Sequence, residues 1–414
     1  MKNAAIIGAG AAGMFCAANL KNADVSVFEA SDAPLKKVLV SGGGRCNFTN
    51  ENIDSQRPEN FYPRGANNLK KVLGRFSAKD ARKFFESIGV KSKVEDGGRV
   101  FPESDNSSDI ARALIYAARQ NGAKIFNRQK VEKIERTRDG KFVLFVNSQT
   151  SLFDAVVLCA GGRWDASLKK SLEDIGHSFE PETPSLFSLK IRQADDARWA
   201  ELSGVSVDDA EISADFGVGK VSARGAVLFT HFGLGGPAVL RLSAFAAKEF
   251  AAANYNAKIS LNIVPQLSED ARKAAFTSAR TEFAKKKIAN VPMFGLPNRL
   301  WSFALEFAEV SPDMQMCALT KDAERKISAF ASAAPFESAG KSEHKAEFVT
   351  CGGIKRSEVD FSTMQSRIVP NLFFAGECLD IDGVTGGFNL HSAWATGKIC
   401  ADFLNKQQPY IATI

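Results

Sequence analysis

The chain opens with an apolar run, a glycine-rich turn and a helical pattern in immediate succession. Residues 4–7 are Ala-Ala-Ile-Ile, and GAGAAG occupies positions 8–13. Apolar residues then recur with helical spacing from 13 to 20, and the stretch 25–28 has the composition of a second buried strand. A strand, a glycine turn, a helix and a second strand in this order predict a βαβ unit.

Each part of this unit has a task in binding a dinucleotide. Gly8 allows the tight turn, Gly10 lets the backbone approach a pyrophosphate, and Gly13 allows the helix to pack closely on the strand. The helix N-terminus offers free N–H groups to the phosphates. Glu29 stands twenty-one residues after Gly8, where a carboxylate can accept a hydrogen bond from a ribose 2′-hydroxyl and argues against a 2′-phosphate. The N-terminal segment is therefore predicted to bind a dinucleotide.

The hydrophobic pattern changes twice further along the chain. Residues 185–265 contain short β-type segments separated by Gly and Asp turns, which predict a small antiparallel sheet or barrel. Residues 267–334 are mainly helical, and the pattern after 352 returns to strand, loop and helix. We therefore expect an α/β chain with a Rossmann-like domain over 1–185 and 352–414, a β-barrel domain over 186–266 and 335–351, and a helical insertion domain over 267–334. The sequence contains no second GxGxxG, so a dedicated nicotinamide-binding domain is not expected.

A triple glycine followed by polar residues forms the second informative stretch. The segment SGGG at 41–44 precedes Arg45, Cys46 and Asn47. A loop of this kind brings the backbone close to a ligand, and its arginine and asparagine can bind one. The alternative is a flexible turn with a charged tip, and we favour the ligand loop.

The last part of the chain has the features of a flavin site. An apolar strand at 371–374 leads to Gly-Glu at 376–377, paired glycines stand at 386–387, and a final helix spans 391–404. The N-terminal end of a helix can stabilise negative charge on a reduced flavin ring. A buried strand at 155–160 runs into a further Gly-Gly pair, which offers the cofactor another close approach.

Composition narrows the class of protein. The 414 residues are too many for one ordinary core, and 45% hydrophobic with 24% charged residues is the balance of a soluble globular enzyme. No run reaches the ~18 apolar residues that span a bilayer, and the N-terminal apolar residues belong to a strand rather than to a signal peptide. Seven scattered cysteines without a CxxC and four separated histidines indicate neither disulfides nor a metal centre. We expect a cytoplasmic protein without a metal.

Residues 57–83 form an unusually basic segment. Eight Lys or Arg residues stand against two acids, a local net charge of +6, and Phe61, Tyr62 and Phe76 lie among them. Cations interleaved with aromatics are typical of contact with single-stranded nucleic acid. The alternative is the solvated face of two helices, one of which should begin at Ser77. RNA contact through 57–83 is therefore a hypothesis.

Taken together, the motifs resemble those of one known family. The stretches concerned are GAGAAGMFCA (8–17), KVLVSGGGRCNFTN (37–50), LFTHFGLGGPAVLRLS (228–243) and the long segment from GGIKRSEVDF to CADFL (352–404). They closely resemble the BaiN/RdsA (YhiN-like) family of bacterial NAD(P)/FAD-dependent oxidoreductases, and the similarity runs from end to end. The resemblance implies an FAD-binding domain of the two-dinucleotide-binding-fold type with a small β-barrel and a helical insertion. It also implies non-covalent FAD, with NAD(P)H as a transient reductant.

The resemblance carries a set of cofactor contacts onto this chain. By motif, FAD would be held by Gly8, Gly10, Ala12, Gly13, Glu29, Arg45, Asn47, Val131, Gly161, Gly376, Glu377, Asp380, Gly387, Phe388 and Asn389. The predicted binding set is completed by the neighbouring residues Ala11, Ala30, Gly44, Cys46, Ala160, Gly162 and Gly386.

Activities in the family diverge, so several functions stay open. The leading hypothesis is a reductase of a conjugated C=C bond, with uridine in large-subunit ribosomal RNA, converted to dihydrouridine, as the best candidate substrate. The basic segment 57–83 favours RNA as the partner. The first alternative is a reductase or oxidase of a small metabolite, such as a steroid enone or an aminoacetone-like amine. The second is a non-catalytic FAD-binding RNA assembly factor.

The general acid of such a reductase is not evident. Cys46, beside Arg45, is one candidate, although it can equally be a small buried filler. His231 in the loop FTHFGLGGP is the other, although a lone histidine is more often structural. The chain also departs from the family at GGRWDASL (161–168), where a Ser-Tyr-Pro and Gly-Ser-Thr-Gly loop is common. This difference weakens the transfer of substrate identity but not that of FAD binding.

Overall fold

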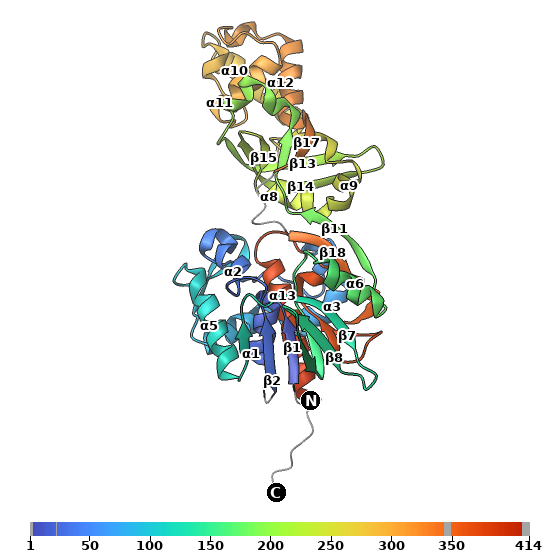
Figure 1. Ribbon diagram of the computed structural model, residues 1–414. Helices are drawn as coiled ribbons and strands as arrows, with labels where there is room; N and C mark the ends of the chain where they lie inside the picture. The colour runs from blue at the N-terminus through green and yellow to red at the C-terminus, as the bar shows by residue number, and fades with distance from the viewer. Residues whose placement is uncertain (1–2, 22, 343–348, 408–414) are drawn as a thin grey trace. The chain divides into compact units, whose positions relative to one another are not determined.

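The computed structural model describes residues 3–21, 23–342 and 349–407, and the chain divides into two compact units. The first unit comprises Met1–Pro184 together with Lys345–Ile414, and the second comprises Ser185–His344. Figure 1 shows the chain leaving the first unit in green and returning to it in orange and red. The second unit is therefore inserted into the first.

A seven-stranded sheet forms the centre of the first unit (Figure 1). Its strand order is β19-β20-β21-β10-β1-β2-β6. The pairs from β21 to β6 are parallel, and β19 and β20 add an antiparallel edge. The bounds are β1 Asn3–Ile7, β2 Asp24–Phe28, β6 Lys124–Phe126, β10 Ala155–Leu158, β19 Val359–Asp360, β20 Gln365–Ser366 and β21 Leu372–Phe374.

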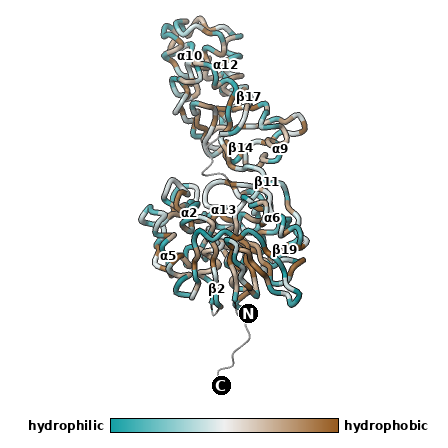
Figure 2. The backbone as a smooth tube through the Cα atoms, in the orientation of Figure 1, coloured by the Kyte–Doolittle hydropathy of each residue, from teal (hydrophilic) through white to brown (hydrophobic). Residues whose placement is uncertain are grey.

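Close packing at glycines joins this sheet to its helices. A Cβ on Gly13 of α1 (Ala11–Asn19) would lie only 2.0 Å from the carbonyl oxygen of Gly8. On the other side of α1, a Cβ on Gly397 of α13 (Phe388–Lys406) would lie 2.5 Å from the carbonyl oxygen of Ala12. Every residue of α1 from 12 to 18 is buried. Figure 2 shows the hydrophobic residues of this unit concentrated around the central strands. α1 is thus a core helix, and glycine at positions 13 and 397 lets it pack closely against the Gly8 turn and α13.

Smaller elements surround the central sheet. The strands β3 (Thr49–Asn50), β5 (Arg99–Pro102) and β4 (Ser92–Glu95) form one three-stranded sheet, and β7 (Val131–Arg136), β8 (Phe142–Val146) and β9 (Gln149–Phe153) form another. β11 (Phe179–Ser185) pairs with β18 (Val349–Ile354). The remaining helices of the unit are α2 Lys36–Val40, α3 Ala66–Arg75, α4 Ala78–Ser87, α5 Ser107–Gln120 and α6 Ala166–Asp174. Ser77 begins α4 with a capping box to Asp80, as its sequence predicts.

The second unit is built on a closed barrel with the strand order β12-β15-β14-β13-β16-β17. The bounds are β12 Leu189–Ile191, β13 Ser206–Asp215, β14 Lys220–Thr230, β15 Gly233–Gly235, β16 Asn256–Asn262 and β17 Ala334–Lys341. Helices α8 (Pro237–Phe245) and α9 (Ala247–Ala252) follow β15, while α7 spans Ala197–Ala200. The barrel confirms the antiparallel sheet or barrel that the short β-type segments predicted.

Three helices lie between β16 and β17 in the chain. They are α10 (Glu269–Glu282), α11 (Asn298–Phe307) and α12 (Lys321–Ala333). Side chains cap two of them, because Ser268 accepts from the N–H of Ala271 and Thr320 accepts from the N–H of Ala323. The helices cluster with the barrel in one compact unit, and their separation as a domain of their own stays a prediction. In the described parts of the chain no helix has the length and apolar character needed to cross a membrane.

Candidate functional site

The candidate site lies at the carboxyl ends of the parallel strands, where ligands bind in open α/β sheets. Gly8 follows β1 with φ of +101°, and a Cβ there would lie 2.3 Å from the carbonyl oxygen of Cys159 after β10. Gly10 differs: apart from its own chain neighbours, no described residue has a heavy atom within 4 Å of the place that its Cβ would take. Gly10 is the N-cap residue of α1, and no side chain caps this helix. The backbone N–H groups at the start of α1 therefore face open space beside a residue that leaves room for a ligand.

Glu29 lies at the end of the neighbouring strand β2. One carboxylate oxygen accepts the N–H of Ala9 at 2.9 Å and the other accepts the N–H of Ser31 at 2.8 Å. Each oxygen keeps a further lone pair, so the carboxylate can also accept a sugar hydroxyl. Val131 is brought close by the pairing of residues 128 and 129 with Ser31 and Glu29, and its side chain is buried. If Val131 contacts FAD as predicted, the contact would therefore be made by its backbone and not by its side chain.

The SGGG loop holds three consecutive glycines in the left-handed region, with φ of +57°, +67° and +85°. A Cβ on Gly43 or Gly44 would meet no heavy atom within 4 Å. Asn47 is buried, and its Oδ1 accepts the N–H of Val100 at 3.2 Å. The backbone of this loop is open to a ligand, whereas the asparagine anchors the loop to β5.

Arg45 is engaged elsewhere in the same unit. Its Nε donates to Asp105 at 2.8 Å, and a second hydrogen bond joins it to Glu95 at 3.2 Å. The guanidinium also lies 4.0 Å from the ring centre of Phe101. Hydrogen bonding from Arg45 lowers the pKa of Glu95, and Lys93 and Arg45 together lower that of Asp105. In this conformation the arginine is therefore neutralised by protein carboxylates rather than directed to a ligand.

Cys46 and His231, the two candidate acids, occupy different environments. Cys46 has no exposed surface, and burial raises the pKa of its thiol to about 12. The interpretation as a buried filler fits this environment better than a role in contact with substrate. His231 is exposed at the turn between β14 and β15 of the second unit, with its ring 5.0 Å from that of Phe232. Its role as an acid stays a prediction.

The side chain of Glu377 lies close to Lys37, to Thr350 and to the glycine pair 161–162. Its carboxylate accepts the N–H of Thr350 at 3.0 Å and the ammonium of Lys37 at 2.7 Å. A Cβ on Gly161 would lie 3.9 Å from the same carboxylate, and one on Gly162 would lie 3.0 Å from its Cγ. The glycine pair after β10, which follows Ala160, therefore lies next to Glu377.

Asp380 is the clearest sign of a missing partner in the first unit. It is completely buried, and its Oδ1 accepts the N–H of Gly352 at 3.2 Å. Among the described residues its Oδ2 has no hydrogen-bond donor, although Arg356 lies 3.3 Å away as an ion pair without hydrogen-bond geometry. A buried acceptor without a donor costs about 1–3 kcal/mol or more. A ligand hydroxyl would satisfy this oxygen, which fits the polyhydroxylated chain of a flavin dinucleotide.

The loop from Asp380 to Asn389 is held from both sides. Asn389 exchanges two hydrogen bonds of 2.8 Å with the backbone of Gly383. Gly387, with φ of +96°, precedes α13 without a side-chain cap, so the start of this helix also has free N–H groups. The carbonyl oxygen of neighbouring Gly386 accepts a hydrogen bond from Asn50 Nδ2 at 2.9 Å. The loop is therefore rigid, with its glycine backbone at the helix N-terminus.

The segment 61–65, which motifs did not assign to the site, supports this loop. Phe61 stacks on Phe388 with ring centres 4.6 Å apart, and the hydroxyl of Tyr62 donates to the carbonyl of Phe388 at 3.0 Å. Arg64 forms a two-point ion pair with the fully buried Asp382. No sequence signal identifies such a pair, because its members are 318 positions apart.

The basic segment 57–83 is only partly available to a partner. Tyr62 and Phe76 are buried, so these two rings cannot stack on bases, and Phe61 is half-buried with its ring stacked on Phe388. Arg64 is buried in its ion pair, and Arg82 pairs with Glu51. The exposed cations of the segment are Arg57, Lys70, Lys71, Arg75, Lys79 and Lys83.

The divergent loop after Gly162 has its own organisation. Asp165 caps α6 by accepting the N–H of Ser167 at 3.0 Å and forms an ion pair with Lys130 at 2.5 Å. Trp164 packs edge-on against Phe179 with ring centres 4.8 Å apart, and its buried indole N–H has no acceptor. Across the described residues, no group of three His, Cys, Asp or Glu side chains is placed to hold a metal.

Comparisons with known proteins give a consistent result. The family model of the HI0933-like protein Rossmann domain matches residues 2–403. A 3-dehydro-bile acid Δ4,6-reductase of Clostridium scindens is 28% identical over 96% of this chain and 98% of its own length. A ribosomal RNA dihydrouridine synthase of Escherichia coli is also 28% identical, over 97% and 98%.

A solved structure supports the fold. The 3-ketosteroid Δ1-dehydrogenase of Sterolibacterium denitrificans has a TM-score of 0.51 to this chain. The match covers 99% of this chain and 100% of that one at 12% identity. At this identity the likeness concerns the fold alone.

Proposed function

The chain belongs to the HI0933-like Rossmann family, and we propose that this FAD-dependent oxidoreductase reduces a conjugated C=C bond with electrons from NAD(P)H. The observation that carries the proposal is a set of groups beyond the carboxyl ends of the parallel strands that leave room for a ligand or can accept its hydroxyl groups. They are the open turn at Gly10, the carboxylate of Glu29 and the donorless Oδ2 of Asp380. Together they match a pyrophosphate, a ribose and a polyhydroxylated chain.

When bound, FAD would supply hydride chemistry at these strand ends. The N–H groups at the start of α1 would bind its pyrophosphate, and Glu29 would accept a ribose hydroxyl. Asp380 would accept a hydroxyl of the ribityl chain, and the uncapped start of α13 after Gly387 offers its positive end to developing negative charge. The buried walls formed by Phe388 and Tyr62 would keep water from the same region.

Uridine of large-subunit ribosomal RNA is the substrate that we favour. Dihydrouridine synthases of Escherichia coli and Haemophilus influenzae align with nearly the whole chain at 28% identity. Reduction of uridine adds a hydride and a proton across a double bond conjugated to a carbonyl, as enone reduction does. Such a substrate requires a cytoplasmic location.

A small enone is the second candidate. The bile acid reductase aligns over the same length and at the same identity as the synthases. The burial of Tyr62 and Phe76 weakens the argument that segment 57–83 binds RNA. The amine oxidase and the non-catalytic assembly factor have no comparable observation in their favour.

The direct test is mass spectrometry of large-subunit ribosomal RNA from cells with and without the gene. We expect deletion to remove one dihydrouridine, and the intact gene to restore it. A variant with Gly10→Ala serves as the control, since it should fold without restoring the modification. Unchanged RNA would exclude the RNA substrate and direct the search to small enones tested against the reduced protein.

A further inference from the structure

The second unit contains a continuous groove on the outside of its barrel. A cavity of about 480 Å³ is lined by strands β13, β16 and β17 and by α11. It shares Phe303 and Phe307 with a neighbouring cavity of about 160 Å³, and Lys258 with another of about 400 Å³. We propose that this groove binds single-stranded RNA. The inference rests on the RNA branch of the proposed function and supplies a binding surface for that substrate.

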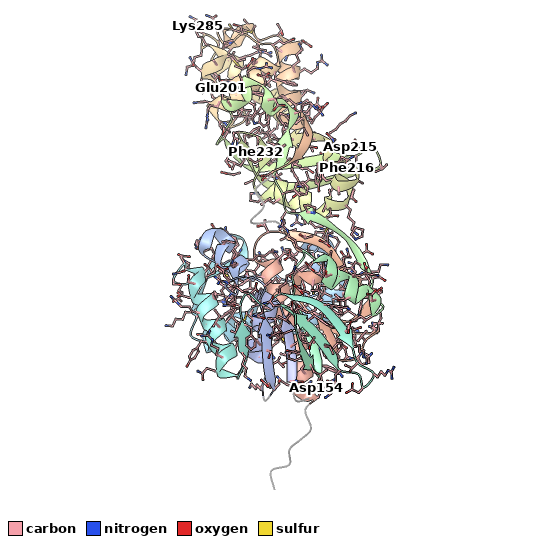
Figure 3. All side chains as sticks on the ribbon, viewed as in Figure 1. Asp154, Glu201, Asp215, Phe216, Phe232 and Lys285 are labelled. Carbon is pink, nitrogen blue, oxygen red and sulfur yellow. The ribbon has the colours of Figure 1, made fainter. Side chains whose placement is uncertain are left out.

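Strand register arranges the floor of the groove in rows. Lys258 on β16 stands opposite Asp215 on β13 and Glu337 on β17, and Asp215 in turn stands opposite Lys220 on β14. The next row pairs Ser213 with Ser260. Figure 3 labels Asp215 at the start of the β13–β14 hairpin. Ammonium and hydroxyl groups therefore alternate with carboxylates along one open face.

Internal ion pairs balance only part of the charge in the groove. Glu337 is paired with Arg192 at 3.0 Å, and Asp215 accepts the N–H of Gly217 at 2.8 Å. In the described chain the side chains of Lys220 and Lys258 form no hydrogen bond or ion pair. With Glu337 neutralised, two lysines face one remaining carboxylate, which favours a ligand that carries phosphates.

The wall of the groove supplies the surface for a base. Phe307 is 47% exposed at the end of α11, and Phe303, one turn earlier, is half-buried beside it. Phe336 closes the floor behind them. A base stacked on an aromatic ring contributes about 1–3 kcal/mol without demanding a particular sequence. An exposed ring next to two unpaired lysines is the combination that a single strand requires.

This combination is absent from the surface that the sequence first indicated. In 57–83 the exposed lysines remain, but the rings of Tyr62 and Phe76 are buried and Phe61 is stacked on Phe388. Segment 57–83 can therefore contribute charge but not stacking. The groove of the second unit supplies both.

The test is fluorescence anisotropy of a labelled, uridine-containing single-stranded oligoribonucleotide with the full-length, flavin-loaded protein. Phe307→Ala should weaken binding roughly 5- to 150-fold because it removes one stacking surface. Phe307→Trp should bind as well as the parent, since the ring is kept. The double variant Lys220→Ala/Lys258→Ala should reduce the slope of log affinity against log salt by about 1.4, since each phosphate contact on a single strand contributes about 0.7.

Two variants serve as matched controls. Tyr116→Ala removes a ring that is 65% exposed on α5 of the first unit, and Lys70→Ala/Lys71→Ala removes two exposed lysines of α3. Tyr116→Ala should leave the affinity for RNA unchanged. In the background of Lys70→Ala/Lys71→Ala, Phe307→Ala should weaken RNA binding by the same factor as in the parent. All variants are compared at equal flavin content and equal thermal midpoint.

The outcomes separate this inference from the proposed function. If Phe307→Ala and Lys220→Ala/Lys258→Ala bind RNA normally, the groove is not the RNA-binding site. The proposal that the enzyme reduces RNA would then still stand. A loss in Phe307→Ala that Phe307→Trp does not restore would also overturn the groove as the binding site, because the effect would then be structural. If the parent protein binds no RNA and gene deletion leaves dihydrouridine unchanged, the RNA function itself fails.

Discussion

Gly10 and Gly13 stand three residues apart in one turn, yet a methyl group at each has a different consequence. At Gly13 a Cβ would lie 2.0 Å from a backbone oxygen, whereas at Gly10 it would meet nothing within 4 Å. Gly10 also has an ordinary φ of −79°, which alanine adopts without strain. The space beside Gly10 is therefore empty of protein, and the dinucleotide interpretation assigns it to the cofactor.

These two glycines give a matched pair of variants. Gly13→Ala should destabilise the fold, because the backbone in a packed core must move by about 1 Å or more to admit the methyl group. Gly10→Ala should keep its thermal midpoint but weaken FAD binding roughly tenfold or more, since the added methyl occupies the approach to the pyrophosphate. Calorimetry and flavin-fluorescence titration distinguish the two. Normal FAD affinity in Gly10→Ala would contradict the assignment of this turn.

His391 shows how a buried group makes stability depend on pH. Its Nε2 lies 3.0 Å from the carbonyl oxygen of Phe76, so Nε2 carries the proton and Nδ1 accepts from the hydroxyl of Thr49 at 2.9 Å. Burial lowers the pKa of His391 from 6.5 to about 4. The ring is thus neutral in the folded protein and satisfied on both nitrogens.

The sign of the pH effect follows from this depressed pKa. Above pH 6.5 the histidine is neutral in both the folded and the unfolded state and has no effect on the pH dependence. As the pH falls from 6.5 towards 4, the unfolded chain binds a proton that the folded chain does not, and up to about 3 kcal/mol of stability is lost. Urea unfolding at several pH values should show this loss in the parent and not in His391→Gln. Parallel pH profiles for the two proteins would refute it.

At the scale of elements, the loop from 380 to 389 depends on the segment that precedes α3. Stacking of Phe61 on Phe388, the bond from Tyr62 and the ion pair of Arg64 with Asp382 all join the two. Glycine again permits the contact, because a Cβ on Gly65 would lie 2.5 Å from the side chain of Ile381. We infer that this part of the basic segment positions the cofactor loop.

Removal of Arg64 tests that inference. Arg64→Ala leaves the buried carboxylate of Asp382 without its partner, which costs about 3–5 kcal/mol. The exchange of both partners in Arg64→Met/Asp382→Leu should be much less destabilising, because no charge is left buried. Both variants are expected to bind FAD more weakly and with a shifted absorption spectrum, measured against Arg82→Ala as the control. An unchanged flavin spectrum in the double variant would show that the ion pair stabilises the fold only.

At this scale the sequence predicted features that depend on neighbouring residues, such as turns, caps and strands. It did not predict ion pairs between residues far apart in the chain. The glycines of the first turn, the acid after β2, the capping box at Ser77 and the β-type segments of the barrel have local signatures. The pairing of Arg45 with Glu95 and Asp105, and of Arg64 with Asp382, depends on tertiary contacts. For the same reason the aromatic residues of 57–83 suggested base stacking, but Tyr62 and Phe76 are buried in the core.

At the scale of the whole molecule, the two compact units carry different tasks. The first unit presents the open turn at Gly10, the carboxylate of Glu29 and the donorless Oδ2 of Asp380 beyond the carboxyl ends of its parallel strands. The second unit presents a barrel with a groove whose lysines are unpaired within the part of the chain that the structure describes. On the proposals made above, the first unit would bind the flavin and the groove of the second would bind the RNA strand that carries the uridine.

The most direct test of this account is an anaerobic absorption experiment on the purified protein. The purified protein should contain a bound flavin, and NAD(P)H should bleach the visible absorption of this flavin. Ribosomal RNA from the deletion strain should then restore the absorption, whereas RNA that already carries the dihydrouridine should not. A protein that binds no flavin, or whose flavin NAD(P)H does not bleach, would contradict the central claim that this is an FAD-dependent reductase.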